Sequence, residues 1–98
     1  MIQVLVRHKV ADYQAWRAVF DAALDFRHKG GEQSARIFRD VEEEGMLTLL
    51  FDWDTMENAR RFMHSPELGT KMKQAGVQGT PEIHFLAEMY LIRRSAAD

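Results

Sequence analysis

An α+β domain built on one four-stranded antiparallel sheet is predicted for this chain of 98 residues. Apolar residues alternate with a period of two in four segments, which is typical of strands. Between these segments they recur at spacings of three and four, which is typical of amphipathic helices. A composition of 46% hydrophobic and 29% charged residues fits one globular domain. We expect this domain over residues 1–92, with a tail at 93–98.

The first strand and the first helix follow directly from this periodicity. Residues 2–9 alternate apolar and polar side chains and are rich in β-branched residues, so they predict a strand. Asp12 is a good helix cap, and the apolar residues that follow predict a helix from Tyr13 to about His28. Gly30 and Gly31 then provide the left-handed position that commonly ends a helix.

The next two strands are predicted to form a hairpin. Residues 33–39 and 46–53 both have strand character, and only 40–45 join them. Parallel strands need a longer crossover, so the two strands must be antiparallel. Three consecutive glutamates at 42–44 raise the alternative of a cation site. We interpret them instead as solvated charges at a loop tip, which discourage pairing between sheet edges.

The second helical region is predicted in two pieces. Asp54 followed by a glutamate three residues later marks a helix start, and this helix runs to about Met63. Ser65 followed by proline marks another start, and this second piece ends at Gly76.

The last strand completes a known order of elements. Thr80-Pro81 is predicted to break the chain, and residues 83–92 alternate again as a strand. The order strand, helix, strand, strand, helix pair, strand is the ferredoxin-like βαββαβ arrangement. Right-handed crossovers place both helical regions on one face of the sheet.

The other face of the sheet is predicted to be apolar too. A sheet with one solvated face shows polar residues at alternate positions, but here both sets of positions carry large apolar side chains. The pairs on opposite faces include Leu5 against Val4 and Val6, Met46 and Leu50 against Leu49 and Phe51, and Leu86 and Tyr90 against Phe85 and Met89. We therefore expect a homodimer in which two open sheet faces pack together as a dimeric α+β barrel. A monomer with an unusually apolar outer face is the alternative.

Composition also excludes several classes of function. A formal net charge of −2 provides no long-range attraction to nucleic acid. The absence of cysteine excludes disulfides, thiolate nucleophiles and iron–sulfur clusters. The first apolar run is too short for a signal peptide or a membrane span. We therefore expect a cytoplasmic protein that binds neither nucleic acid nor membrane.

Two polar residues are the candidate catalytic groups. His8 falls on the same side of the first strand as Val4 and Val6, where a pocket between sheet and helices would lie. Its expected pKa near neutrality suits a general base. Arg36 lies in the middle of a strand, where its guanidinium could hold an anionic oxygen. The structural alternatives are a hydrogen-bonded histidine at a strand end and an edge-strand arginine paired with an acid of the partner subunit.

Aromatic residues are the candidate ligand wall. Such side chains suit a flat aromatic ligand, but core packing needs the same residues. The candidates are Trp16, Phe20, Phe38, Phe51, Trp53 and Phe62. The remaining histidines, His28, His64 and His84, have no metal-ligand spacing, so we assign no metal site.

Several segments resemble proteins of the dimeric α+β barrel superfamily. Within it, the chain is most similar to uncharacterised, cyclase-labelled relatives of antibiotic-biosynthesis monooxygenases. The likeness covers about residues 1–90 and lies in 12–21, 35–39, 50–54, 57–60, 65–68 and 79–83. It implies the fold; members include cofactor-free oxygenases, polyketide cyclases, isomerases and haem-degrading enzymes, so the fold alone does not choose the chemistry.

The haem-degrading branch is disfavoured by individual residues. The iron-ligating histidine of those enzymes would fall near Met72 in this chain. Their first strand carries an asparagine, where this chain offers Gln3, Arg7 and His8. We therefore expect no cofactor.

Two functions remain open from the sequence. One is a module that binds a small aromatic or polyketide-like molecule without catalysis. The other is a cofactor-independent monooxygenase or a cyclase-type enzyme that acts on such a compound, with His8 as base and Arg36 as anion stabiliser. An open cavity with His8 or Arg36 pointing into it would favour the enzyme, whereas a cavity filled by its own aromatic side chains would disfavour catalysis.

Overall fold

The sheet has the strand order β2-β3-β1-β4 in the computed structural model, which describes residues 2–94. Its strands are β1 (Ile2–Val10), β2 (Glu32–Arg39), β3 (Met46–Trp53) and β4 (Val77–Ala87), and every pair is antiparallel. The predicted α+β class and ferredoxin-like order are confirmed. In this order β2 and β4 are the two edges of the sheet.

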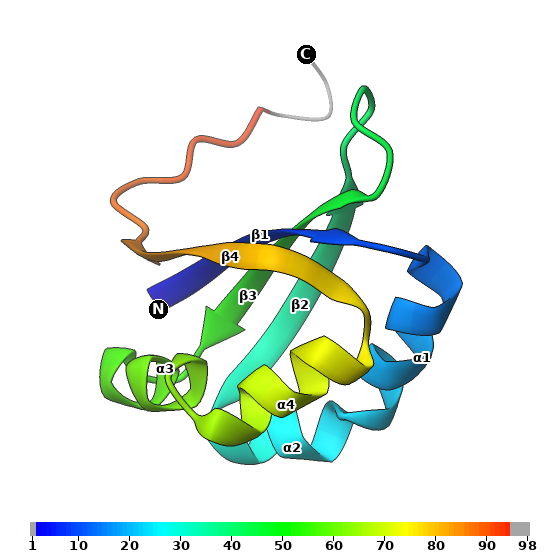
Figure 1. Ribbon diagram of the computed structural model, residues 1–98. Helices are drawn as coiled ribbons and strands as arrows, with labels where there is room; N and C mark the ends of the chain where they lie inside the picture. Colours follow the sequence, from blue (N-terminus) through cyan, green and yellow to red (C-terminus); the bar gives the residue numbers. More distant parts are fainter. Residues whose placement is uncertain (1, 95–98) are drawn as a thin grey trace.

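Four helices cover one face of the sheet, as Figure 1 shows. They are α1 (Tyr13–Ala22), α2 (Leu24–Gly30), α3 (Met56–Met63) and α4 (Pro66–Gln74). Asp12 and Ser65 cap α1 and α4 as predicted, whereas the cap of α3 is Thr55 rather than Asp54. Of the helices in residues 2–94, none is long and apolar enough to cross a membrane.

The predicted continuous helix from Tyr13 to His28 is wrong, because the chain breaks at Ala23. The Ala23 N–H donates to the carbonyls of both Val19 and Phe20, at 3.1 and 3.2 Å. The guanidinium of Arg27 donates to the Phe20 carbonyl as well. This carbonyl is therefore taken out of the regular ladder, and α2 starts as a separate helix at Leu24.

The predicted bounds of the last strand are also wrong. β4 begins at Val77 and ends at Ala87, and the Gly79-Thr80-Pro81 segment lies inside it. The pairing with β1 shifts between Arg7 and Lys9, where this segment is accommodated as an irregularity. Because β4 is an edge strand, it has no neighbour on its outer side in the described sheet. The N–H that Pro81 lacks is therefore not needed for a hydrogen bond on that side.

Residues 88–94 follow β4 without strand structure. Figure 1 shows this segment in orange and red, on the side of the sheet away from the helices. Four consecutive large apolar side chains in it are exposed: Met89, Tyr90, Leu91 and Ile92. Of the predicted tail, residues 95–98 lie outside the described part of the chain.

The core lies between the sheet and the helices. Val4, Val6, Leu47 and Trp53 are essentially inaccessible to solvent. Their neighbours along each strand point to the other face, which we call the open face, where Leu5 is paired with Leu50 and His84. No helix of residues 2–94 covers the open face, so its apolar side chains remain partly exposed.

Candidate functional site

His8 points from β1 toward the helices, as the alternation of this strand predicts. It is 4% exposed, and its ring lies edge-on against Trp16 with 5.8 Å between ring centroids. Within residues 2–94, neither of its buried ring nitrogens has a hydrogen-bond partner. Burial lowers the pKa of the imidazole from 6.5 to about 4, so the expected pKa near neutrality is wrong. His8 is therefore neutral at pH 7, with one donor and one acceptor nitrogen.

A cavity of about 70 Å³ lies beside His8, between the sheet and all four helices. Most of its lining is aliphatic or aromatic, and no acidic residue of the described chain contributes to it. The residues that matter for its chemistry are His8, Arg27 and Lys71. A volume of this size has room for several water molecules.

Aromatic rings form much of the cavity wall. Trp16 and Phe20 are stacked with 4.9 Å between their ring centroids, and the Phe20 and Phe51 ring centroids are 6.4 Å apart. Phe62 and Phe26, also 4.9 Å apart, form the side near α2 and α3. Four of the six predicted wall residues, Trp16, Phe20, Phe51 and Phe62, therefore lie at this cavity.

Trp53 does not line the cavity but supports its wall. It is completely buried and packs against Phe51 and Phe62, with 5.8 and 4.9 Å between centroids. Its indole N–H donates to the Gly30 carbonyl at 2.9 Å. A Cβ atom at Gly30 would overlap the Phe62 ring. Glycine thus lets this ring lie directly on the α2 backbone.

Arg36 and Phe38 lie on the open face, so the predicted placement of these two residues at the pocket is wrong. Arg36 is paired with Leu50 and Phe38 with Thr48, whereas Ala35 and Ile37 between them face the helices. Arg36 is exposed, and its guanidinium carbon is 5.1 Å from the Phe38 ring centroid. Arg36 and His8 of one chain are therefore separated by the sheet and do not share a site.

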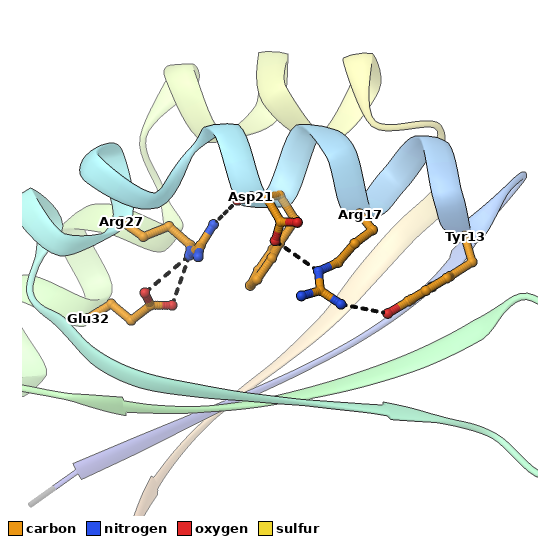
Figure 2. Close-up of polar contacts among 6 residues, drawn as sticks. Tyr13, Arg17, Asp21, Arg27 and Glu32 are labelled. Carbon is orange, nitrogen blue, oxygen red and sulfur yellow. Dashed lines mark hydrogen bonds and ion pairs between the residues drawn. The ribbon is translucent and has the colours of Figure 1, made fainter.

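A buried ion pair that the sequence analysis missed borders the cavity. Arg27 Nε is 2.9 and 3.1 Å from the two carboxylate oxygens of Glu32, and the two residues are 8% and 4% exposed. Figure 2 shows the guanidinium between this carboxylate and α1. Its central carbon lies 3.6 Å from the centroid of the Phe20 ring. The pair thus fixes one aromatic side chain of the wall.

Lys71 is a second cation that the sequence analysis missed. Leu68, Lys71, Met72 and Ala75 have helical spacing on the side of α4 that faces the cavity. The Lys71 ammonium lies 5.0 Å from the Phe26 ring centroid, and the residue is half-buried. A basic residue at an otherwise apolar spacing was the available signal for it.

The other histidines and the acidic loop lie away from the cavity. His28 and His84 approach Glu32 and Glu82 at 3.9 and 3.5 Å, and His64 contacts the Arg60 carbonyl. The amides of Glu42 and Glu43 donate to Asp40, as in a simple turn. Across the described residues, no group of three or more acids and histidines could hold a metal ion.

The arrangement combines an apolar cavity with few polar groups. A neutral imidazole in its wall has one nitrogen that can donate a hydrogen bond and one that can accept a hydrogen bond. The rings can pack against the faces of a flat molecule. Small-molecule sites of proteins generally combine apolar walls, which remove a ligand from water, with a few polar groups that orient it.

Sequence comparisons find no relative of this chain: no protein-family model matches it, and no curated protein matches it. Solved structures do share its fold. A candidate antibiotic biosynthesis monooxygenase of Bordetella bronchiseptica has a TM-score of 0.74 at 20% identity, over 91% of this chain and 97% of that chain. A corresponding protein of Caulobacter crescentus has a TM-score of 0.70 at 21% identity, over 91% and 90% of the two chains.

A characterised oxygenase also has this fold. A variant of SnoaB, a cofactor-independent oxygenase of Streptomyces nogalater, has a TM-score of 0.72 at 14% identity, over 95% of this chain and 97% of that chain. The resemblance to antibiotic-biosynthesis-monooxygenase-like proteins is thus confirmed at the level of the fold. Identities in this range establish the fold and leave the chemistry open.

Proposed function

We propose that this protein binds a small, flat, largely apolar molecule in the cavity between its sheet and helices. The observation that carries the proposal is His8, whose two ring nitrogens are buried without a partner in the described chain. A buried polar group in this state costs about 1–3 kcal/mol. A ligand carbonyl or hydroxyl that hydrogen-bonds to the imidazole would recover this cost in the complex.

The cavity of about 70 Å³ accommodates only part of an aromatic ligand unless its wall yields. Two methionines, Met63 and Met72, belong to the lining. Methionine has flexible rotamers and adapts readily to a bound surface. We therefore expect ligand entry to move the side chains of α3 and α4 while the sheet side, with His8, stays in place.

Binding of an aromatic ketone and of an aromatic hydroxyl compound tests the proposal. Titration of the protein with 9-anthrone and 1-naphthol, followed by Trp16 and Trp53 fluorescence and by amide NMR, should shift signals of the cavity residues. His8→Leu removes both nitrogens at similar volume and should weaken binding about tenfold, the size expected for one lost hydrogen bond. His64→Leu, at an exposed position, is the matched control. Equal binding by the wild type and His8→Leu would contradict the role of His8.

We propose further that the working unit is a homodimer joined through the open face. Phe38 and Leu86 are 42% and 39% exposed on this face, beside Leu5 and Leu50. Fully burying each such side chain is worth about 1.5–3 kcal/mol. A second copy fits this face because a sheet with the same twist and the same apolar residues is self-complementary across a two-fold axis.

The segment 88–94 supports the same partner. Met89 and Ile92 are 92% and 80% exposed, which leaves a row of apolar side chains in water in the isolated chain. The segment continues from the edge strand β4, and the other edge, β2, also has no neighbour in the described sheet. In a dimer these residues would lie against the second sheet or its free edge.

A cofactor-independent oxygenase is the second candidate function. It is favoured by the shared fold of SnoaB and by the neutral His8 at the cavity. In such a reaction a base removes a proton from a CH₂ group beside aromatic rings. The carbanion then reacts with dioxygen, one oxygen atom becomes the product carbonyl, and the other leaves as water. A developing anion would raise the pKa of the imidazolium and so help His8 to hold the proton.

Oxygen uptake distinguishes the two functions. With 9-anthrone as the substrate, an oxygenase consumes one dioxygen for each quinone formed, and His8→Leu should lose most of this rate. General base catalysis is worth about 10²–10⁴-fold. Binding without oxygen uptake above the uncatalysed rate would leave the ligand-binding function and reject the oxygenase.

A further inference from the structure

A positive charge with no internal partner among the described residues lies beside the cavity. Its lining has two basic residues, Arg27 and Lys71, and no carboxylate from the described chain. Arg27 is neutralised by Glu32, which holds it through two hydrogen bonds at 2.9 and 3.1 Å. For Lys71, no ion pair within 4.0 Å is formed with the acids of residues 2–94. Only one of the two charges therefore has an internal partner.

The position of Lys71 in α4 makes this charge unusual. Leu68 and Ala75 lie three residues before and four residues after it, on the same side of the helix, and both line the cavity. Lys73, by contrast, is on the exposed side. The Phe26 ring, 5.0 Å from the ammonium, also lines the cavity. This distance fits a cation–π contact, which keeps the ammonium beside a ring of the cavity wall.

From this arrangement we infer that the ligand is an organic acid: a flat aromatic molecule that carries a carboxylate or an ionised phenol. The inference rests on the proposed ligand-binding function and specifies its ligand class. The apolar part of such a molecule would fill the cavity between Trp16, Phe20 and Phe62. Its anionic oxygen would pair with Lys71, and a carbonyl or hydroxyl on the ring system would reach His8.

The physical basis is the low dielectric of the cavity. An anion at the edge of the cavity gains more from the half-buried ammonium than it would from an exposed one, because less water screens the pair. A neutral ligand of the same shape gains only the apolar contacts and the His8 hydrogen bond. The site should therefore select the charged member of a pair of ligands of equal size.

Matched probes test this directly. 2-Naphthoate and 2-naphthamide have nearly the same shape and differ in charge. Calorimetric titration at pH 7 should show that the wild type binds the naphthoate about ten- to hundredfold more tightly, the range of one charge-assisted hydrogen bond. Lys71→Met keeps the apolar stem of the side chain and should remove the preference by weakening the naphthoate alone. Lys73→Met, two residues further on in α4, should keep it.

The outcomes separate the two proposals. If the wild type binds both probes equally, or if Lys71→Met keeps the preference, the inference about the acid is overturned while the cavity remains a binding site. If neither probe binds at millimolar concentration, both the acid and the proposed ligand-binding function are rejected. Circular dichroism of the two variants, which alter side chains outside the fully buried core, verifies that each is folded.

Discussion

At the scale of the residue, His8 connects stability with function. Its buried imidazole is unpaired in the described chain and has a pKa of about 4. Placing apolar side chains around a polar ring costs folding free energy, so a chain selected for stability alone would have an aliphatic residue here. Such a cost is typical of sites that are completed by a ligand.

His8 predicts how stability depends on pH. In the unfolded chain the imidazole takes up a proton near pH 6.5, but in the folded chain only near pH 4. The contribution of neutral His8 is therefore complete above about pH 6.5 and is lost as the pH falls toward 4, by up to about 3 kcal/mol. Urea unfolding between pH 4 and 7 measures this slope.

His8→Leu should remove that part of the pH dependence. It should also raise the free energy of unfolding at pH 7 by about 1–3 kcal/mol, because two buried polar atoms are replaced by methyl groups. A variant less stable than the wild type at pH 7 would show that the imidazole has hydrogen-bond partners in solution.

The ion pair of Arg27 and Glu32 gives a second prediction at this scale. Arg27→Met leaves a buried carboxylate without its partner and should destabilise the fold by about 3–5 kcal/mol. The double variant Arg27→Met with Glu32→Leu should recover much of this loss, because no charge remains buried. Denaturant unfolding of both variants gives the comparison, and an equal loss in both would contradict it.

At the scale of the element, two glycines with different environments make a matched test. Gly31 follows α2 with φ of 115°, and a Cβ atom there would overlap Asp54. Gly31→Ala should therefore destabilise by about 1–3 kcal/mol. Gly69 lies inside α4 with no atom near its Cβ position, so Gly69→Ala should stabilise by about 0.5–1 kcal/mol. Thermal unfolding shows both signs.

The elements also show what the sequence could predict. Alternation in β1 places His8 correctly, because it depends only on neighbours in the same strand. In β2 the small and apolar residues Ala35 and Ile37 alternate with Arg36 in the same way, and this pattern was the available signal that Arg36 faces away from the helices. The break at Ala23 depends on Arg27 reaching back to a carbonyl of α1, and local periodicity contains no information about such a contact.

Sequence periodicity also failed at both ends of β4. Alternation continues to residue 92, but a strand forms only where it pairs with a partner strand, and the described pairing with β1 ends at Ile2 and Ala87. At the other end, Pro81 is a strand breaker only in a central strand, and β4 is an edge. Both errors arise because the limits of β4 depend on its position at the edge of the sheet, and local sequence propensity contains no information about that position.

At the scale of the whole molecule, the two sheet faces have different roles. The helices cover one face and create the cavity, while the open face and residues 88–94 expose apolar side chains. We therefore expect sedimentation at micromolar concentration to show a species of twice the 11.4 kDa chain mass. A single species of 11.4 kDa would reject the dimer.

The apolar segment after β4 can be tested separately. Replacement of Met89, Tyr90, Leu91 and Ile92 by serine should weaken the dimer, since it removes four side chains that would be buried between subunits. The folded monomer should keep its stability, because these side chains are exposed in it. Sedimentation at several concentrations measures the first effect and thermal unfolding the second.

The contact of Gly30 with Phe62 couples the side-chain sizes that these two positions can accept. The benzyl ring occupies the space in which a methyl group of residue 30 would stand. Gly30→Ala should therefore destabilise the fold while Phe62 is present. The added variant Phe62→Leu, with a smaller side chain, should restore the stability. Related chains with a larger residue at position 30 should therefore have a smaller one at position 62. Because Phe62 lines the cavity, this paired replacement would change the cavity shape and leave His8 unaltered.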